Sequence, residues 1–307
     1  MPLNSPGNDS LDNSKTGTLY IVATPIGNLN DITLRALETL KKVDIIAAED
    51  TRHTRQLLAH FNITSRLIAC HEHNEQQSAK GIMEKLKTGS SVALVSNAGT
   101  PTVSDPGYRI VNAAINEAIP IVPIPGAAAA ITALSVSGLP TDSFCFIGFL
   151  PSKKQKRHVR LKQLTGISAT LIFYESPKRI LTVLDEMIQI MGDRHAVLAR
   201  EMTKSYEEFL RGNLSQLIAT LASKNAIKGE ITLLVSGDKE KEAFCFEDIS
   251  DQIESALRKD EMSISTLART FSTSYGISKN RLYEKILELK SRMAHEPGEG
   301  KGEKKDG

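Results

Sequence analysis

Residues 18–31 read TLYIVATPIGNLND, a short aliphatic run joined to a loop that is rich in proline and glycine. The run at 19–23 has the length and the aliphatic content that are typical of a buried strand. An amphipathic segment follows at 32–40, with apolar residues at 34, 37 and 40, and Asp31 is placed to be its N-cap. The stretch therefore predicts a strand, a loop and a helix in succession.

The same unit recurs along the first half of the chain. Further short aliphatic runs stand at 43–48, 66–70, 91–95 and 121–124, and amphipathic patterns such as 82–86 lie between them. Strand–helix–strand alternation implies parallel pairing through right-handed crossovers. We therefore expect an open α/β domain over residues 17–140.

A second α/β domain is expected over residues 141–240. Strands are predicted at 144–149, 170–174, 196–199 and 231–235, and helices at 177–191 and 214–222. Gly192 stands where a helix C-cap favours glycine. The connection at 151–162 is short and basic, and it marks the boundary between the two domains.

Beyond Gly237 the pattern changes to helices only. Segments 265–271 and 279–289 flank a short break with Gly276 at the turn, a spacing like that of a helix-turn-helix. A helical domain is therefore expected over 241–292, which either contacts nucleic acid or only packs against the rest. The polar ends, residues 1–16 and 293–307, are expected to be disordered.

Composition excludes several classes of protein. The net charge is +2, so bulk charge does not indicate a nucleic-acid binder and local clusters must carry that argument. The three cysteines, Cys70, Cys145 and Cys245, lie far apart and form no metal or redox pair, which fits a reducing cytoplasm. No apolar run is long enough to suggest a membrane span, and residues 1–17 lack the apolar core of a signal peptide. A soluble cytoplasmic protein is expected.

The loops that follow the five strands of the first domain hold the unusual residues. They cover 24–28, 49–55, 71–75, 96–107 and 125–127, and parallel strands would bring all five to one edge of the sheet, where ligands bind. One such loop could be a mere turn, but five on one edge favour a site. Gly27, Gly99 and Gly126 would let the backbone approach a ligand closely. No dinucleotide or P-loop motif is present.

Two clusters of charge leave alternatives open. The first cluster consists of Glu49, Asp50, Arg52 and Arg55. It is either the start of a helix whose charges neutralise one another, or the entrance of a site where Arg52 or Arg55 binds a phosphate. A basic run at 153–162 is either a solvated turn or a contact with RNA phosphates, for which we select Lys153, Lys154 and Arg157. The pair His71 and His73, around Glu72, has no obvious third ligand, so no metal site is expected.

At these loops the sequence resembles the ribosomal RNA small subunit methyltransferase I family of the tetrapyrrole methylase superfamily. The similar motifs follow in order from about residue 17 to 237: they lie at 18–31, 47–52, 98–101, 104–107, 123–126, 148–151, 173–176 and 199–201. The helical tail is similar to the small C-terminal domain of that family, but more loosely.

The resemblance implies two α/β domains that hold S-adenosylmethionine in the cleft between them, usually in a homodimer. It implies methyl transfer to the ribose 2′-oxygen of a cytidine in the decoding region of 16S ribosomal RNA, in free RNA or in the small ribosomal subunit. It also implies the residues that border the cofactor: Pro25, Gly27, Asn97, Ala98, Gly99, Thr100, Pro125 and Ala127 from the first domain, and Phe173 and Arg200 from the second. Asn97 departs from the family, whose members commonly have Asp there, so a base at 97 is not expected.

Methyl transfer to an oxygen needs alignment and removal of a proton. Glu49, Asp50, Glu72 and Glu175 are the candidate bases by position, and alignment without a dedicated base is the alternative. Two other functions stay open: a C-methyltransferase acting on a tetrapyrrole precursor, and a non-catalytic RNA-binding assembly factor. The basic run and the helical tail favour RNA methylation.

Overall fold

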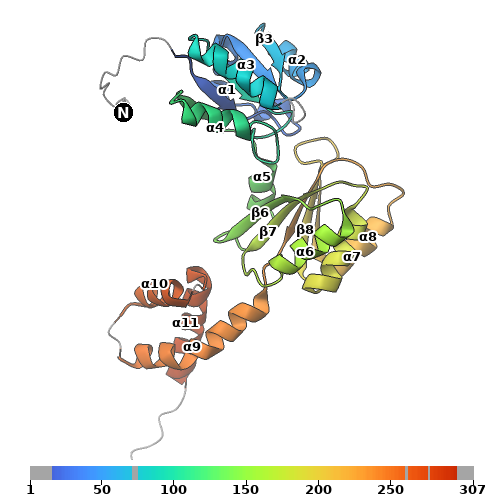
Figure 1. The fold of residues 1–307 in the computed structure, drawn as a ribbon. Helices are drawn as coiled ribbons and strands as arrows, with labels where there is room; N and C mark the ends of the chain where they lie inside the picture. The colour runs from blue at the N-terminus through green and yellow to red at the C-terminus, as the bar shows by residue number, and fades with distance from the viewer. Residues whose placement is uncertain (1–15, 71–74, 260–261, 276, 296–307) are drawn as a thin grey trace, which may run out of the picture.

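The computed structural model describes residues 16–70, 75–259, 262–275 and 277–295. In these residues the chain forms two α/β domains and a helical unit, one after the other (Figure 1). The expected fold class, two α/β domains followed by a small helical domain, is confirmed.

The first domain is built on a five-stranded parallel sheet. Across the sheet the strand order is β3-β2-β4-β1-β5, and every neighbouring pair is parallel. The strands are β1 (Leu19–Val22), β2 (Ile45–Ala48), β3 (Arg66–Ala69), β4 (Val92–Val95) and β5 (Ile121–Ile124). Each lies within a predicted aliphatic run, and parallel pairing places all five carboxyl ends on one edge.

Helices cover both faces of this sheet. α1 (Leu34–Lys42) and α2 (Thr51–His60) pack on one face, while α3 (Glu75–Lys87) and α4 (Tyr108–Asn116) pack on the other. Because each face has its own buried cluster, the strands can be aliphatic throughout instead of alternating with polar residues.

The start of α1 differs from the sequence prediction. Asp31 belongs to a separate 3-10 helix, Leu29–Asp31, and the N-cap of α1 is Thr33. The Thr33 hydroxyl accepts a hydrogen bond from the backbone N–H of Ala36 at 3.1 Å. Both residue types can cap a helix, so only the path of the chain decides between them.

The second domain has a five-stranded mixed sheet in the order β6-β7-β10-β8-β9. Its strands are β6 (Phe144–Phe149), β7 (Thr170–Glu175), β8 (His195–Arg200), β9 (Glu208–Asn213) and β10 (Ile231–Val235). Only β6 and β7 pair in parallel. Strand β9, which the sequence did not predict, lies at the edge and carries polar residues that give no aliphatic run.

One face of the second sheet is covered by α6 (Lys154–Leu164), α7 (Ile180–Met191) and α8 (Leu214–Ala222). The other face is covered by α5 (Ala129–Ser135), which packs against β8 and β10. The sequence placed α5 in the first domain, whereas Figure 1 shows it as the link from the first domain onto the second. The chain therefore crosses between the domains at 125–128, upstream of the predicted boundary.

The helical unit consists of α9 (Lys239–Lys259), α10 (Ile264–Tyr275) and α11 (Lys279–His295), with its own buried cluster. The Ser278 hydroxyl contacts the Asp142 carboxylate of the second domain. The predicted helices at 265–271 and 279–289 are confirmed, while Gly276 and the Cys245 side chain lie outside the described residues. Among the residues that are described, none forms a helix long and apolar enough to cross a membrane.

Candidate functional site

The strand-end loops of the first domain are hydrogen-bonded to one another. Thr24 and Gly99 exchange two backbone hydrogen bonds, of 2.9 and 3.0 Å, which tie the loop after β1 to the loop after β4. The Thr100 hydroxyl donates to the Ala127 carbonyl at 3.3 Å and so ties in the loop after β5. Gly99 has φ +80°, a conformation that other residues rarely adopt. These loops form one connected surface.

The loop after β2 joins the same surface through Asn97. The backbone N–H of Asn97 donates to Glu49 Oε2 at 3.1 Å, and the Asp50 N–H donates to Asn97 Oδ1 at 3.2 Å. An aspartate at 97 could accept the same bond from Asp50, so the amide keeps the bond and loses only the charge. Asn97 and Glu49 therefore link the loops after β2 and β4.

The segment that continues this surface toward the second domain is strained. Thr102 has φ +73° and Ser104 has φ +65°, left-handed values that are uncommon for residues with a side chain. A Cβ atom on Gly148 of β6 would lie 2.9 Å from Ser104 Oγ, so the loop comes close to the second sheet where that sheet carries a glycine. The loop thereby closes the gap between the domains.

A cavity of about 540 Å³ lies between the two domains. The first domain and the start of α5 contribute small and apolar residues: Ile26, Ala98, Gly99, Thr100, Val103, Ala128, Ala129, Ala130 and Ile131, together with Ser104 and Asp105. The second domain contributes mainly β6 and the end of β7, with Phe144, Phe146, Phe149, Tyr174, Glu175, Ser176 and Pro177, and also Met202 and residues 229–232. The size and the mainly apolar lining suit a small organic ligand.

Asp105 is the carboxylate that faces this cavity without a cationic partner among the described residues. Burial raises the pKa of its carboxyl to about 6; a hydrogen bond from the Ser96 hydroxyl opposes the shift and the negative charge of Glu49 adds to it. A carboxylate with a pKa near 6 is suited to accept a proton at neutral pH. The sequence motif at 104–107 contained Asp105, yet its composition gave no sign of burial.

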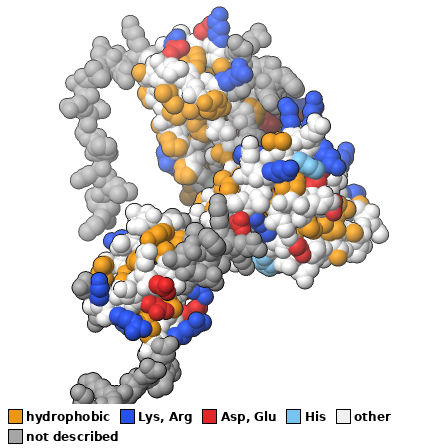
Figure 2. Space-filling model, turned by 60° about the horizontal axis from the view of Figure 1, so that its bottom comes forward, with side chains coloured by type: hydrophobic (Ala, Val, Ile, Leu, Met, Phe, Trp, Pro, Cys, Tyr) orange, Lys and Arg blue, Asp and Glu red, His pale blue; other side chains and the backbone are white. Residues whose placement is uncertain are grey.

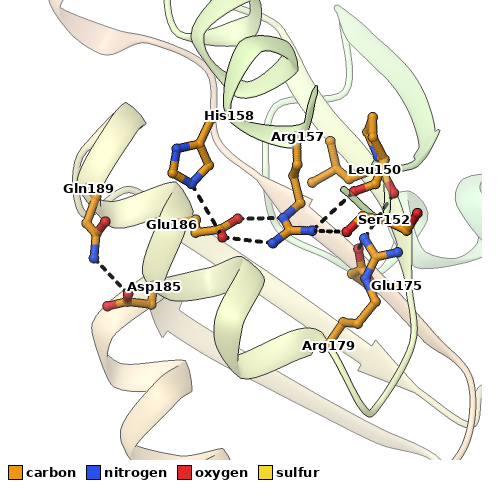
Figure 3. A network of polar contacts seen from close by, with 10 residues as sticks. Leu150, Ser152, Arg157, His158, Glu175, Arg179, Asp185, Glu186 and Gln189 are labelled. Atoms are coloured by element: carbon orange, nitrogen blue, oxygen red, sulfur yellow. Dashed lines mark hydrogen bonds and ion pairs between the residues drawn. The ribbon is translucent and has the colours of Figure 1, made fainter. Parts of the chain in front are cut away.

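Glu175, the predicted base on the second domain, is held differently. Its Oε1 accepts a hydrogen bond from Arg179 Nη2 at 2.8 Å (Figure 3). Its Oε2 accepts one from the Ser176 N–H at 2.8 Å. Burial raises the pKa of this carboxyl, although the Ser176 N–H and the positive charges of Arg179 and Arg157 oppose the rise. Glu175 lines the cavity, but its oxygens are already engaged.

Arg157 corrects one expectation about RNA contacts. Its side chain is only 7% exposed, and its guanidinium donates to both Glu186 oxygens, at 2.5 and 2.8 Å, and to the carbonyls of Pro151 and Ser152 (Figure 3). A guanidinium so enclosed cannot reach a phosphate. Lys153 and Lys154, the other two predicted contacts, are exposed at the start of α6.

Asp50, Arg52 and Arg55 lie on the first domain, outside the cavity lining. Asp50 is the N-cap of α2 and accepts hydrogen bonds from the backbone and the side chain of Arg52. These bonds lower the pKa of Asp50 to about 2, so it is a weak proton acceptor. The structure therefore supports the self-neutralising helix start for Asp50 and Arg52, while Arg55 is exposed on α2.

The eight first-domain residues expected to border a cofactor divide into three groups. Ala98, Gly99 and Thr100 line the cavity, while Pro25, Asn97, Pro125 and Ala127 belong to the same loops without lining it. Gly27 faces the second domain instead, where an added Cβ would come within 2.5–2.8 Å of Thr203, Lys204 and the Met202 carbonyl.

Two members of the expected set lie elsewhere. Phe173 is fully buried in the core of the second domain, because side chains alternate along β7 and its neighbours Tyr174 and Ile172 take the other face. Arg200 pairs with Glu208 at 2.9 Å and lines a separate polar hollow with Tyr206 and Lys224. His71, Glu72 and His73 lie outside the described residues, and the residues that are described hold no cluster able to bind a metal.

Comparison with known proteins shows that the fold is that of the tetrapyrrole methylases. The family model for tetrapyrrole (corrin/porphyrin) methylases matches residues 18–218. A solved structure of uroporphyrin-III C-methyl transferase from Thermus thermophilus, complexed with S-adenyl homocysteine, superposes with a TM-score of 0.52 at 17% identity, covering 71% of this chain and 97% of that one.

Curated relatives are much more similar in sequence. A protein of Halalkalibacterium halodurans named ribosomal RNA small subunit methyltransferase I is 55% identical over 73% of this chain and 78% of its own length. A protein of the same name from Escherichia coli O157:H7 is 48% identical over 91% of this chain and 97% of its own.

Proposed function

The chain belongs to the family of ribosomal RNA small subunit methyltransferase I, within the tetrapyrrole methylases, and from this membership we propose that it methylates RNA of the small ribosomal subunit. The observation that carries the proposal is the 48% identity to such a protein over 91% of the chain. S-adenosylmethionine is the methyl donor, and the acceptor is the ribose 2′-oxygen of a cytidine in 16S ribosomal RNA.

The residues around the cavity fit such a donor. Ala98, Gly99 and Thr100 bring the backbone of one loop to the ligand, and Ile26 and Met202 offer apolar surface for an adenine ring. Asp105 and Glu175 place negative charge in the same space, which suits a sulfonium cation. When bound, S-adenosylmethionine supplies an electrophilic methyl group on a sulfur that departs as a neutral thioether.

The protein must then align the 2′-oxygen and take its proton. We assign the proton to Asp105, because it faces the cavity, has no cationic partner there and has a pKa of about 6. As the oxygen lone pair forms the new O–C bond, the O–H electrons stay on oxygen and the proton moves to the Asp105 carboxylate. Alignment by the strained loop at 102–107 and by the facing strands supplies the rest of the rate.

The atom that is methylated can be tested by its chemistry, because a 2′-O-methyl group blocks alkaline cleavage of the adjacent phosphodiester. Small subunits from a strain lacking the protein would be incubated with the enzyme and labelled S-adenosylmethionine, and their RNA hydrolysed in alkali. We expect label in an alkali-resistant dinucleotide that contains cytidine. Label in mononucleotides, or label accepted only by a tetrapyrrole precursor, would contradict the proposal.

A homodimer and a cytoplasmic location remain predictions. Exposed apolar side chains on α4, Tyr108 and Ile115, offer surface that a second copy could cover. Light scattering on the purified protein gives the number of chains directly, and fractionation of cells gives the location.

A further inference from the structure

Three of the nine phenylalanines of the chain lie within the six residues of β6. In a regular strand Phe146 and Phe149 would point to opposite faces, because they are three residues apart. The pairing of β6 with β7 shifts between Phe146 and Gly148, and this bulge brings both rings to the side of Tyr174. Their centroids lie 5.0 and 5.7 Å from the Tyr174 ring. The bulge thus assembles an aromatic cluster at the cavity.

Phe149 is the member of this cluster that faces outward. It lines the cavity and is nevertheless 59% exposed, so it stands at the rim, whereas Phe146 packs against the cluster beneath α5. Tyr174 meets it edge to face at 63°, which fixes the orientation of the ring and covers at most one of its faces. Because this exposed ring belongs to the lining of the cavity, it is accessible to a ligand at the rim.

Cations follow this ring directly in the chain. Lys153, Lys154 and Lys156 are exposed at the start of α6, and no described residue forms an ion pair with them. Proteins that bind single-stranded nucleic acid combine aromatic rings, on which bases stack, with nearby cations that contact the phosphates. The chain combines both features within eight residues, 149–156: the ring lines the cavity, and the lysines follow it where α6 begins.

We propose that Phe149 is the stacking platform for a nucleobase of the RNA strand that enters the cavity, splayed out from its neighbours. The proposal rests on the function proposed above and deepens it, because it identifies where a base of the substrate lies. A ribose in a stacked helix is not free to enter a cavity of this kind, and sequence-specific RNA recognition commonly uses unstacked bases held on aromatic rings. The adjacent lysines favour this occupant over an apolar surface of a second copy.

The test compares Phe149→Leu, which keeps an apolar side chain and removes the ring, with Phe149→Tyr, which keeps the ring. Tyr206→Leu, at an exposed aromatic residue outside the cavity lining, serves as the control for loss of an exposed ring. Each variant is titrated with a short single-stranded RNA that carries 2-aminopurine, whose fluorescence is quenched by stacking. KM and kcat with small subunits, S-adenosylhomocysteine affinity by calorimetry and the oligomeric state are measured in parallel.

We expect Phe149→Leu to abolish the quenching and to raise KM for subunits roughly tenfold, since stacking contributes by about that factor per base. Phe149→Tyr should stay within about threefold of the wild type, and all variants should bind S-adenosylhomocysteine alike. Unchanged RNA binding by Phe149→Leu would overturn the proposal. So would a loss of S-adenosylhomocysteine affinity, which assigns the ring to the cofactor, or a change in oligomeric state, which assigns it to a second copy. If the wild type quenches the probe but methylates no subunits, only the proposed function fails.

Discussion

The two walls of the cavity are built in different ways. The first-domain wall consists of loops at the ends of parallel strands, which offer backbone and small residues such as Ala98 and Gly99. The second-domain wall consists of β6 and the end of β7, which offer aromatic rings and a carboxylate supported by a buried polar network. Figure 2 shows lysine and arginine side chains gathered on the second domain beside hydrophobic patches.

Because the two walls are built differently, substitutions in them should have different effects on function and on stability. A wall of loops is shaped by backbone torsions, so substitutions there should act mainly on binding and catalysis. A wall of strands continues into the domain core, so substitutions there should act mainly on stability. Asp105 and Glu175, two carboxylates on opposite walls, give the sharpest test of this contrast.

The largest effect is expected for Asp105→Asn. It removes the proposed proton acceptor, so kcat should fall by roughly 10²- to 10⁴-fold with the affinity for S-adenosylhomocysteine nearly unchanged. In the wild type, kcat/KM, which follows the ionisation of the free enzyme, should rise as the pH passes about 6 and then level off, because only the deprotonated carboxylate accepts the proton. Glu175→Gln, the comparison variant, should lower kcat less, and it should reduce stability, which Asp105→Asn should not. Equal losses of kcat would erase the contrast between the walls.

Asp105→Asn should also change stability with pH in a fixed direction. The pKa of Asp105 in the folded protein, about 6, exceeds its ordinary value of 3.8. A raised carboxyl pKa favours folding at low pH, and this contribution is lost as the pH rises through 6. At pH 8 the free energy of unfolding, measured by denaturant titration, should therefore be higher for the variant than for the wild type by about 1–3 kcal/mol. At pH 4 the two proteins should have nearly the same free energy of unfolding. A difference that does not depend on pH would exclude the carboxylate as its cause.

The next effect is expected within the polar network of the second domain. Arg157→Ala leaves the Glu186 carboxylate buried without its partner, so the free energy of unfolding should fall by about 3–5 kcal/mol. Lys156→Ala, one residue earlier and exposed, should change it by less than about 0.5 kcal/mol. Denaturant titration followed by circular dichroism measures both. If Arg157→Ala weakened RNA binding in a protein of normal stability, the guanidinium would belong to the RNA contact after all.

Gly99→Val tests the wall of loops. With φ +80° at this position, the valine must strain the backbone or shift the loop, and cofactor affinity should fall at least tenfold. Gly138→Val is a matched control, since Gly138 has φ +76° and nothing within 4 Å of an added Cβ. The control should lose similar stability without losing affinity. Calorimetry with S-adenosylhomocysteine showing equal affinities for both variants would remove the 96–101 loop from the site.

The smallest effect is expected for the exposed lysines. Replacing Lys153, Lys154 and Lys156 with alanine should weaken RNA binding several-fold and flatten its salt dependence by roughly 0.7 in slope per lost phosphate contact with a single strand. Replacing Lys41 and Lys42 at the end of α1 removes charge from the first domain and should leave the slope unchanged. Filter binding at several salt concentrations measures this slope for each protein. If the variant and the wild type had equal slopes, the lysines at 153–156 would not contact RNA phosphates.

Much of the architecture follows from local pattern. The predicted bounds of β5, β6, β10 and α8 agree with the structure, because each is a continuous apolar or amphipathic segment. Strand β9 was missed because an edge strand needs no aliphatic run, and α6 because its charged residues read as a connection. The residues alone predicted the site as one edge of the first sheet. The second wall was expected only from the resemblance, and of its named residues Glu175 lines the cavity whereas Phe173 and Arg200 do not.

The sequence by itself determined that the first domain is a parallel α/β sheet and that its glycine- and proline-rich loops share one edge, because periodicity and connectivity are local properties of the chain. Only the tertiary structure decided which charges are buried. Arg157 and Lys156 are adjacent and both basic, yet one faces Glu186 in the interior and the other faces solvent. The pKa of Asp105 and the outward ring of Phe149 likewise depend on a neighbouring domain and on a bulge. Burial is set by what packs against a side chain, and those partners lie far away in the sequence.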